Sequence, residues 1–386
     1  MLARHFSRYF DANPGRLHFA AHSHHPWPDA TREAHLRYWD DAATLADRKW
    51  TRIFEEVVPR AQGHVARLLQ LADPRQVAFA PNTHEFVTRL LSCLPVDRPA
   101  KIVTSAHEFH SFRRQAHRLR EAGRVTLVEV PAEPWQSFTE RFIATVRRER
   151  PDMVWLSHVF FDSGFVVPDL DAIVDAAPGE ALVAIDGYHA FCALPVDLSR
   201  IHRRAFYIAG GYKYAMSGEG ACFLAIPPGS AQRPVNTGWY AAFGTLSGAQ
   251  EGQVPYGEGA MRFWGSTFDA SGLYRFNAAM EWLQSVQWTI ADVHRHSLSM
   301  QKHFLDGLAR LGKRELPAAA LVPPAEIARG NFLAFDIDDA EAVHAKVTAR
   351  DVTIDRRDRR LRFGFGVYHD GVQVQHLLER LASGLA

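Results

Sequence analysis

Residues 181–189 read ALVAIDGYH, and residues 205–214 read AFYIAGGYKY. In each stretch, an apolar run typical of a buried strand ends in residues that carry chemistry. Asp186 stands at the C-terminal end of the first run. The second run is followed by two glycines, a tyrosine and then Lys213. The carboxyl ends of parallel strands meet at one edge of a sheet, where α/β proteins bind their ligands. We therefore predict that Asp186 and Lys213 share one site.

This acid and this lysine suit pyridoxal phosphate. The amine of Lys213 would form a Schiff base with the cofactor aldehyde, and Asp186 would pair with the pyridinium nitrogen so that the ring draws electrons. The alternative for each residue alone is structural, because Asp often caps a turn and a lysine beside glycines is usually a solvated charge. The two residues together favour the cofactor.

The composition is that of a globular protein, with 386 residues of which 47% are hydrophobic and 23% charged. Forty-four basic residues against 43 acidic ones give a net charge of +1, so no electrostatic case exists for a nucleic-acid partner. Cys93, Cys192 and Cys222 lack paired spacing, which favours reduced thiols. No segment has signal-peptide or transmembrane length, so we expect no membrane association and a cytoplasmic location.

Strands and helices alternate along most of the chain. We expect helices over 31–50, 53–71, 84–94, 112–121, 140–148 and 170–175, and strands over 76–79, 101–105, 125–130, 153–161, 181–185, 205–209 and 220–226. This order predicts an α/β fold with a mostly parallel central sheet flanked by helices.

A helical stretch over 273–311 leads to a smaller α+β C-terminal part, with strands over 332–337, 352–355 and 361–365 and helices over 340–350 and 372–385. We divide the chain into a large cofactor-binding domain, 16–270, and a small domain, 271–386, which also takes residues 1–15.

Three motifs carry a family resemblance: DGYH at 186–189, YKY at 212–214 and GEG at 218–220. They resemble the aspartate and lysine motifs of class V, fold-type I pyridoxal phosphate enzymes. Among these they are most similar to kynureninases, where the lysine lies in a Tyr-Lys-Tyr context. The resemblance runs from about Phe19 to Asp370. It implies the fold-type I architecture and a homodimer whose active site lies at the subunit interface.

The resemblance places the cofactor phosphate at NTHE, residues 82–85. This segment begins a helix after a strand, and free amides at a helix start attract anions. Thr83 and His84 are the candidate ligands, with Tyr212 as a further one beside the lysine. The alternative is an ordinary helix cap by Asn82 or Thr83.

Two further residues are expected at the cofactor ring. Phe109 would stack on the ring, with His110 in its place if the register shifts by one; a core phenylalanine is the alternative. His189 would hydrogen-bond the cofactor's phenolic oxygen or reach the substrate. A structural, hydrogen-bonded histidine would explain it equally.

Two aromatic loops, 236–239 and 263–267, resemble kynureninase loops that pack at the cofactor, partly from the neighbouring subunit. Trp239, Ser266 and Thr267 are therefore candidates for the phosphate site or the pocket wall. A dry dimer interface would also explain aromatic loops.

The segment HSHHPW, residues 22–27, is rich in histidine. Its spacing fits neither a helical histidine pair nor a zinc-finger pattern, so we expect no metal. The resemblance places this loop on the substrate side of the pocket, with His24 as a substrate-binding candidate.

Arg362 is the single charge in the apolar stretch 361–368, which begins with the predicted strand 361–365, and a buried arginine needs an anionic partner. A substrate α-carboxylate could accept its two parallel hydrogen bonds. The alternative is a structural ion pair with Asp336 or Asp355.

The resemblance implies that the enzyme acts on an α-amino acid. In a kynureninase-like reaction, aldimine and ketimine formation precede attack of water on a γ-carbonyl and hydrolytic cleavage of the Cβ–Cγ bond. The alternative is a class V aminotransferase, which would release a keto acid. Cysteine desulfurase chemistry needs a thiolate in the C-terminal half, and no cysteine follows Cys222. The HSHH loop departs from the Gly-Asn-Ser sequence usual in kynureninases, so the substrate stays open.

Overall fold

A computed structural model describes residues 2–245 and 252–386 of the chain. Its largest element is a seven-stranded sheet in the order β2-β8-β7-β6-β5-β3-β4. Only β8 runs against its neighbours, so the sheet is mostly parallel, as predicted. The strands are β2 Val77–Ala80, β3 Ala100–Ser105, β4 Val125–Val130, β5 Met153–Ser157, β6 Leu182–Asp186, β7 Ala205–Gly210 and β8 Cys222–Ala225.

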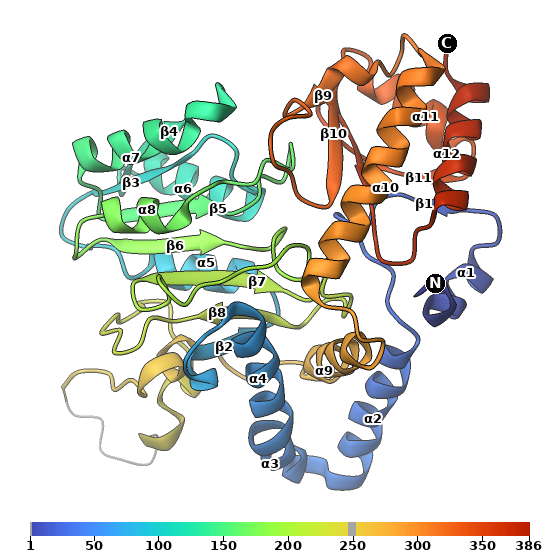
Figure 1. Ribbon diagram of the computed structural model, residues 1–386. Coiled ribbons are helices and arrows are strands. Elements are labelled where there is room, and N and C mark those ends of the chain that lie inside the picture. Colours follow the sequence, from blue (N-terminus) through green and yellow to red (C-terminus); the bar gives the residue numbers. More distant parts are fainter. Residues whose placement is uncertain (1, 246–251) are drawn as a thin grey trace.

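Helices flank this sheet because its central strands are apolar throughout and cannot face water. Figure 1 shows α7 and α8 in front of the sheet and α5 and α6 behind it. The indole of Trp155 in β5 stacks on the ring of Phe112 in α6, with centroids 4.3 Å apart. The helices of this part are α2 Ala30–Leu45, α3 Lys49–Arg52, α4 Val58–Leu69, α5 Thr83–Leu91, α6 His110–Glu121, α7 Phe138–Glu149, α8 Leu170–Ala176 and α9 Ser271–Ser285.

The C-terminal part has its own antiparallel sheet, in the order β12-β13-β10-β9, and its own hydrophobic core. Phe304, Phe335 and Leu377 meet in that core, from a helix, a strand and the last helix in turn. The elements are α10 Ile290–Leu311, β9 Leu321–Val322, β10 Phe332–Asp336, α11 Ala340–Thr348, β11 Val352–Thr353, β12 Asp355–Arg357, β13 Arg360–Gly364 and α12 Gly371–Gly384. The expected helix over 273–311 is interrupted, since α9 ends at Ser285 and α10 begins at Ile290.

The N-terminal segment crosses the C-terminal part before it enters α2. After the short helix α1 (Ser7–Ala12), strand β1 (Leu17–His18) pairs in parallel with β11. An isolated bridge then joins Ala20 to Gly364 at the end of β13. Thus Leu17 and His18, which our division assigns to the large domain, lie beside a strand of the small one; the division itself stays a prediction.

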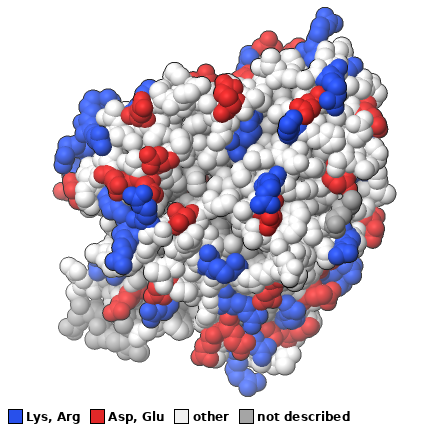
Figure 2. All heavy atoms as spheres, in the orientation of Figure 1, with Lys and Arg blue, Asp and Glu red and all other residues white. Residues whose placement is uncertain are grey.

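Charged side chains of both signs are interspersed on the face shown in Figure 2, in keeping with the net charge of +1. None of the helices within residues 2–245 and 252–386 is both long and apolar enough to span a bilayer.

Candidate active site

A cavity of about 550 Å³ opens at the carboxyl edge of the central sheet. Residues from both sheets and from the N-terminal segment form its wall. Seven of the predicted site residues line this cavity: Thr83, Phe109, Asp186, His189, Tyr212, Lys213 and Arg362. The structure therefore gathers in one place side chains that are widely separated in the sequence.

Lys213 lies in the loop that follows β7. Its Nζ is 2.5 Å from Nε2 of His189 and about 5 Å from two ring centroids, at 5.0 Å from Tyr188 and 5.3 Å from Phe109. Burial lowers the pKa of Lys213 to about 7, against the attraction of the Asp186 carboxylate, which raises it. Near neutral pH a substantial share of this amine is therefore unprotonated, the form that attacks a carbonyl carbon.

Asp186 ends β6 and faces the same cavity. Its Oδ1 accepts a hydrogen bond of 2.9 Å from the backbone N–H of Tyr188, which fixes the direction of the carboxylate. Burial raises its pKa, and the Tyr188 N–H and Lys213 act in the opposite direction. The next residue is Gly187, and only glycine fits there because a Cβ would collide with the ring of Tyr207 on β7.

His189 completes this group. Besides its contact with Lys213 it has a second ring nitrogen, Nδ1, which is buried without a hydrogen-bond partner. Burial, together with the charge of Lys213, holds its pKa well below 6.5, so the imidazole is neutral. A neutral ring offers one donor and one acceptor, and the one at Nδ1 has no hydrogen-bond partner.

Glu108 is a buried residue of the site that the sequence analysis did not identify. Its carboxylate accepts hydrogen bonds from the hydroxyl of Ser105 (2.5 Å) and from the N–H and hydroxyl of Ser157 (3.1 and 2.6 Å). Burial raises its pKa to about 7, against these bonds. Glu108 thus ties the ends of β3 and β5 together and holds Phe109, the next residue, at the cavity wall.

The predicted phosphate end lies at the start of α5. Asn82 caps this helix by accepting the N–H of Glu85 at 3.2 Å, and Thr83 lines the cavity beside it. The hydroxyl of Tyr212 is 2.9 Å from Nδ1 of His24. His24 itself does not line the cavity, whereas His22 of the same loop does.

Arg362 is 2% exposed and lies on β13. One terminal nitrogen donates to the carbonyl of Phe161 and the other to Oδ2 of Asp355, while its Nε is buried without a partner. Asp355 also pairs with Arg357, which lines the cavity, at 3.1 Å. Of the two carboxylates considered above, Asp355 is the one that contacts Arg362; Asp336 pairs with other arginines.

Three loop candidates lie away from the cavity wall in this chain. Trp239 is 43% exposed, and Thr267 borders a separate small hollow with Arg89 and Trp264. Ser266 borders the same hollow.

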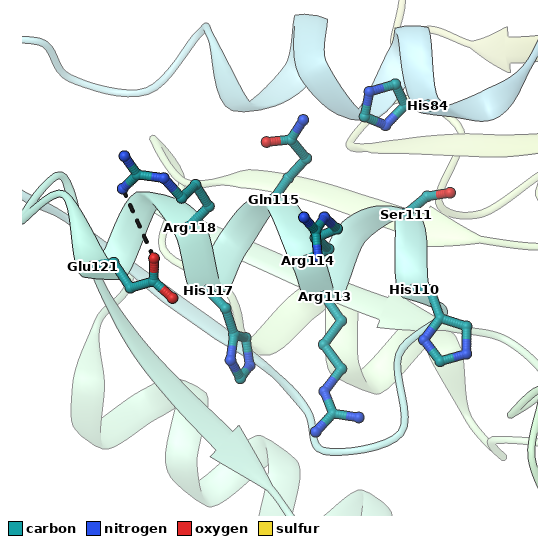
Figure 3. A pocket seen from close by; sticks show the side chains of 9 residues that line it. All are labelled: His84, His110, Ser111, Arg113, Arg114, Gln115, His117, Arg118 and Glu121. Carbon is teal, nitrogen blue, oxygen red and sulfur yellow. Dashed lines mark ion pairs between the residues drawn. The ribbon is translucent and has the colours of Figure 1, made fainter. Parts of the chain in front are cut away.

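A larger hollow of about 910 Å³ lies outside the cavity, over α6 (Figure 3). Its lining is largely basic and comes from His84 on α5 and, on α6, from His110, Ser111, Arg113, Arg114, Gln115, His117, Arg118 and Glu121. His84 and His110, both named as candidates above, therefore face this hollow. Because neither Lys213 nor Asp186 reaches it, we assign the chemistry to the smaller cavity.

Within the described ranges, no group of three or more His, Cys, Asp or Glu side chains is arranged to hold a metal ion. The histidines of the 22–27 loop serve other contacts. His25, for example, is buried with its Nδ1 2.7 Å from the carbonyl of Pro26.

Comparison with known families gives one extended match, to the model of aminotransferase class V, over residues 28–350. Isopenicillin N epimerase of Streptomyces clavuligerus is 29% identical over 188 residues, which cover 47% of this chain and 46% of that protein. The methionine import ATP-binding protein MetN of Corynebacterium efficiens is 31% identical over 150 residues, 35% of this chain and 41% of its own length. The chain thus spans less than half the length of both curated relatives.

Solved structures match over nearly the whole chain. The cystine C–S lyase C-DES, in complex with cysteine persulfide, has a TM-score of 0.80 at 19% identity and covers 97% of this chain and 99% of its own. A C-DES mutant with glycine covalently linked to its PLP cofactor also scores 0.80, at 18% identity, over 98% and 99% of the two chains. The apo cysteine desulfurase of Thermococcus onnurineus scores 0.79 at 16% identity, over 95% and 94%. These likenesses confirm the predicted fold.

Proposed function

The chain belongs to the aminotransferase class-V family, and on that premise we propose that it is a pyridoxal phosphate enzyme that acts on an α-amino acid. The observation that carries the proposal is the buried pair in one cavity, Lys213 with a pKa of about 7 and Asp186 at the end of the neighbouring strand. In the structural alternative, a solvated lysine and a turn-capping aspartate, the two side chains would be exposed and would not line the same cavity.

The residues present fit the cofactor. Lys213 would bind its aldehyde carbon, Asp186 would face its ring nitrogen, Phe109 would cover its ring, and Thr83 with Tyr212 would hold its phosphate. When bound, the cofactor supplies an electron-withdrawing ring that stabilises negative charge on the substrate carbon beside the amine.

The protein's own groups supply the proton transfers and the orientation. Lys213, with its pKa near 7, can take a proton from the substrate Cα and give it back. Its contact with His189 at 2.5 Å holds the amine in place between those two transfers. Arg362 would bind the substrate α-carboxylate from the small-domain side. Phe109 and Phe161 line the wall between these groups and keep water from it.

We further propose the kynureninase-like outcome, hydrolytic cleavage between Cβ and Cγ, on the strength of the Tyr-Lys-Tyr and Asp-Gly-Tyr-His motifs. The competing outcome is transamination, which the name of the matching family favours. Desulfurase chemistry is less supported, because Cys222, the cavity's thiol, is buried and burial raises its pKa to about 12.

Product analysis decides between the two outcomes. Holoenzyme is incubated with a panel of L-amino acids that includes L-kynurenine and other γ-carbonyl compounds. Release of alanine without any keto acid supports hydrolysis, whereas keto acid formation supports transamination. Protein that binds no pyridoxal phosphate and turns over no amino acid contradicts the whole proposal.

We also propose a cytoplasmic homodimer. The dimer is supported by four exposed apolar side chains, Trp239 in the 236–239 loop and Val235, Phe243 and Val254 outside it. The cytoplasmic location is supported by three free cysteines, which suit a reducing compartment. Light scattering of the purified protein measures the oligomeric state, and a monomeric mass at micromolar concentration would refute the dimer.

A further inference from the structure

His22 is a buried polar residue without hydrogen bonds. Its side chain is 0% exposed and lines the cavity, yet neither Nδ1 nor Nε2 has a hydrogen-bond partner. Its ring stacks on Phe332, with centroids 4.5 Å apart and planes 18° from parallel. Nearly all buried polar side-chain atoms in proteins are hydrogen-bonded, so an unpaired imidazole at a cavity wall indicates a partner that arrives with a ligand.

A second unpaired nitrogen lies on the same wall. Arg362 uses both terminal nitrogens, for Phe161 and Asp355, but its Nε is buried and unpaired. Nε2 of His22 is 3.7 Å from Oδ2 of Asp355, the same oxygen that accepts from Arg362. His22 and Arg362, which both line the cavity, therefore meet at one carboxylate oxygen, and each also has a buried nitrogen without a hydrogen-bond partner.

The backbone around His22 holds the ring in this position. The N–H of Gly364 donates to the carbonyl of Phe19 at 2.7 Å, and the N–H groups of Ser23 and His24 both bond the carbonyl of Ala20 at 2.9 Å. A Cβ at position 364 would collide with Nδ1 of His22, so only glycine leaves room for the imidazole there. With Nδ1 against this backbone, Nε2 is the nitrogen that faces Asp355.

The ring is also neutral, because burial and the nearby charge of Arg362 hold the pKa of His22 well below 6.5. A neutral imidazole has one N–H to donate. The acceptor that suits a donor beside an arginine is a carboxylate, which takes several hydrogen bonds at its two oxygens.

We propose that His22 is a substrate-binding residue, whose Nε2–H donates to the α-carboxylate of the amino acid that Arg362 holds. The assignment rests on the proposed function. In this proposal His22, and not His24, is the histidine of the loop that contacts substrate. His22 is then a second donor to the carboxylate beside Arg362, and an amine without a carboxylate binds more weakly because it leaves both donors unpaired.

The test compares two probes, L-alanine and ethylamine, which differ in the carboxylate. Each is titrated into holoenzyme, and binding is followed by the visible absorbance of the bound cofactor. The variant His22→Phe keeps the stacking on Phe332 and removes both nitrogens. The dissociation constant for L-alanine should rise about 10- to 100-fold, as expected for the loss of a hydrogen bond to a charged group, and that for ethylamine should stay within about twofold.

The matched control is His64→Phe, which removes another buried histidine whose Nε2 has no partner but which lies outside the cavity wall. It should bind both probes as the wild type does. If His22→Phe leaves L-alanine binding unchanged, or weakens both probes alike, the assignment is wrong.

A second measurement uses the wild-type protein, so its result does not depend on whether a variant folds correctly. In wild-type holoenzyme with ¹⁵N-labelled histidine, L-alanine should slow the solvent exchange of one imidazole N–H and shift its resonance, and ethylamine should do neither. If no imidazole signal responds to L-alanine although the cofactor absorbance does, His22 does not bind the carboxylate. A wild type whose absorbance responds to neither probe refutes the proposed function itself.

Discussion

Lowering the pH from 7.5 to 5.0 should reduce the free energy of unfolding by about 4 kcal/mol through four buried groups. Burial lowers the pKa of His18 to about 3 and those of His25 and His158 to about 4, from the ordinary 6.5. The unfolded chain takes up a proton at each position below pH 6.5 and the folded chain does not. Each histidine therefore costs about 2 kcal/mol of stability at pH 5.0.

Glu108 acts in the opposite direction. Its folded pKa of about 7 exceeds the ordinary 4.5, so the folded state holds its proton first and gains about 2 kcal/mol over the same interval. Burial also raises the pKa of Asp186, which adds to this gain, whereas His22, His189 and His369, with pKa values well below 6.5, add to the loss. The net effect is a protein that is stable at neutral pH and loses stability as the pH falls below 6.5.

Urea unfolding at pH 7.5, 6.5, 5.5 and 5.0 measures the effect, at constant protein and cofactor concentrations. The variant His158→Gln should remove about 2 kcal/mol of the pH dependence. The control is His376→Gln, at an exposed position of α12, which should leave the pH dependence as it is. Equal stability at pH 7.5 and 5.0, or a His158 variant with an unchanged pH profile, would refute the reasoning.

Three further predictions concern the cavity. Borohydride reduction of holoenzyme and peptide mapping should find the pyridoxyl group on Lys213, and a label on any other lysine contradicts the assignment. Replacing Asp186 by Ala should lower turnover by several orders of magnitude while the circular dichroism spectrum persists, because the ring nitrogen loses its counter-charge; near-normal turnover would count against its role. Arg362→Lys should raise KM for amino acids about tenfold or more, because lysine cannot form the planar fork. Since Arg362 also contacts Asp355 and the Phe161 carbonyl, the melting temperature should fall by a few degrees; equal effects on amino acids and on ethylamine would leave it a purely structural role.

The fold could be predicted from the sequence where strands are short apolar runs between amphipathic helices. Strand β4, expected over 125–130, has those bounds in the structure. The expected strand over 153–161 was too long, since β5 ends at Ser157. The run stays apolar beyond that point because Val159 and Phe161 line the cavity, so hydrophobicity alone does not mark the end of the strand.

The sequence identified Asp186 and Lys213 as site residues because Asp186 is the last residue of one apolar strand and Lys213 lies three residues beyond the end of the next. Glu108 and His22 were not, because their surroundings arise only from the tertiary fold. Glu108 bonds Ser157, 49 positions away, and His22 stacks on Phe332 in the opposite half of the chain. The loop over 22–27 was recognised as part of the site, but its sequence does not distinguish which histidine faces inward.

The pairing of the N-terminal segment with the C-terminal sheet has a consequence for biosynthesis. His18 on β1 contacts the hydroxyl of Tyr368, which is 350 positions later in the chain. His22, four residues after His18, lines the cavity. A ribosome releases the N-terminal segment long before β11 and β13 exist, so this part of the wall has no partner until residues 352–364 have been synthesised. The central sheet can form earlier, but the substrate side of the cavity closes last. Chains that stop before Val352, and so lack both β11 and β13, should therefore retain a sheet with Asp186 and Lys213 and lack the enclosure that makes them reactive.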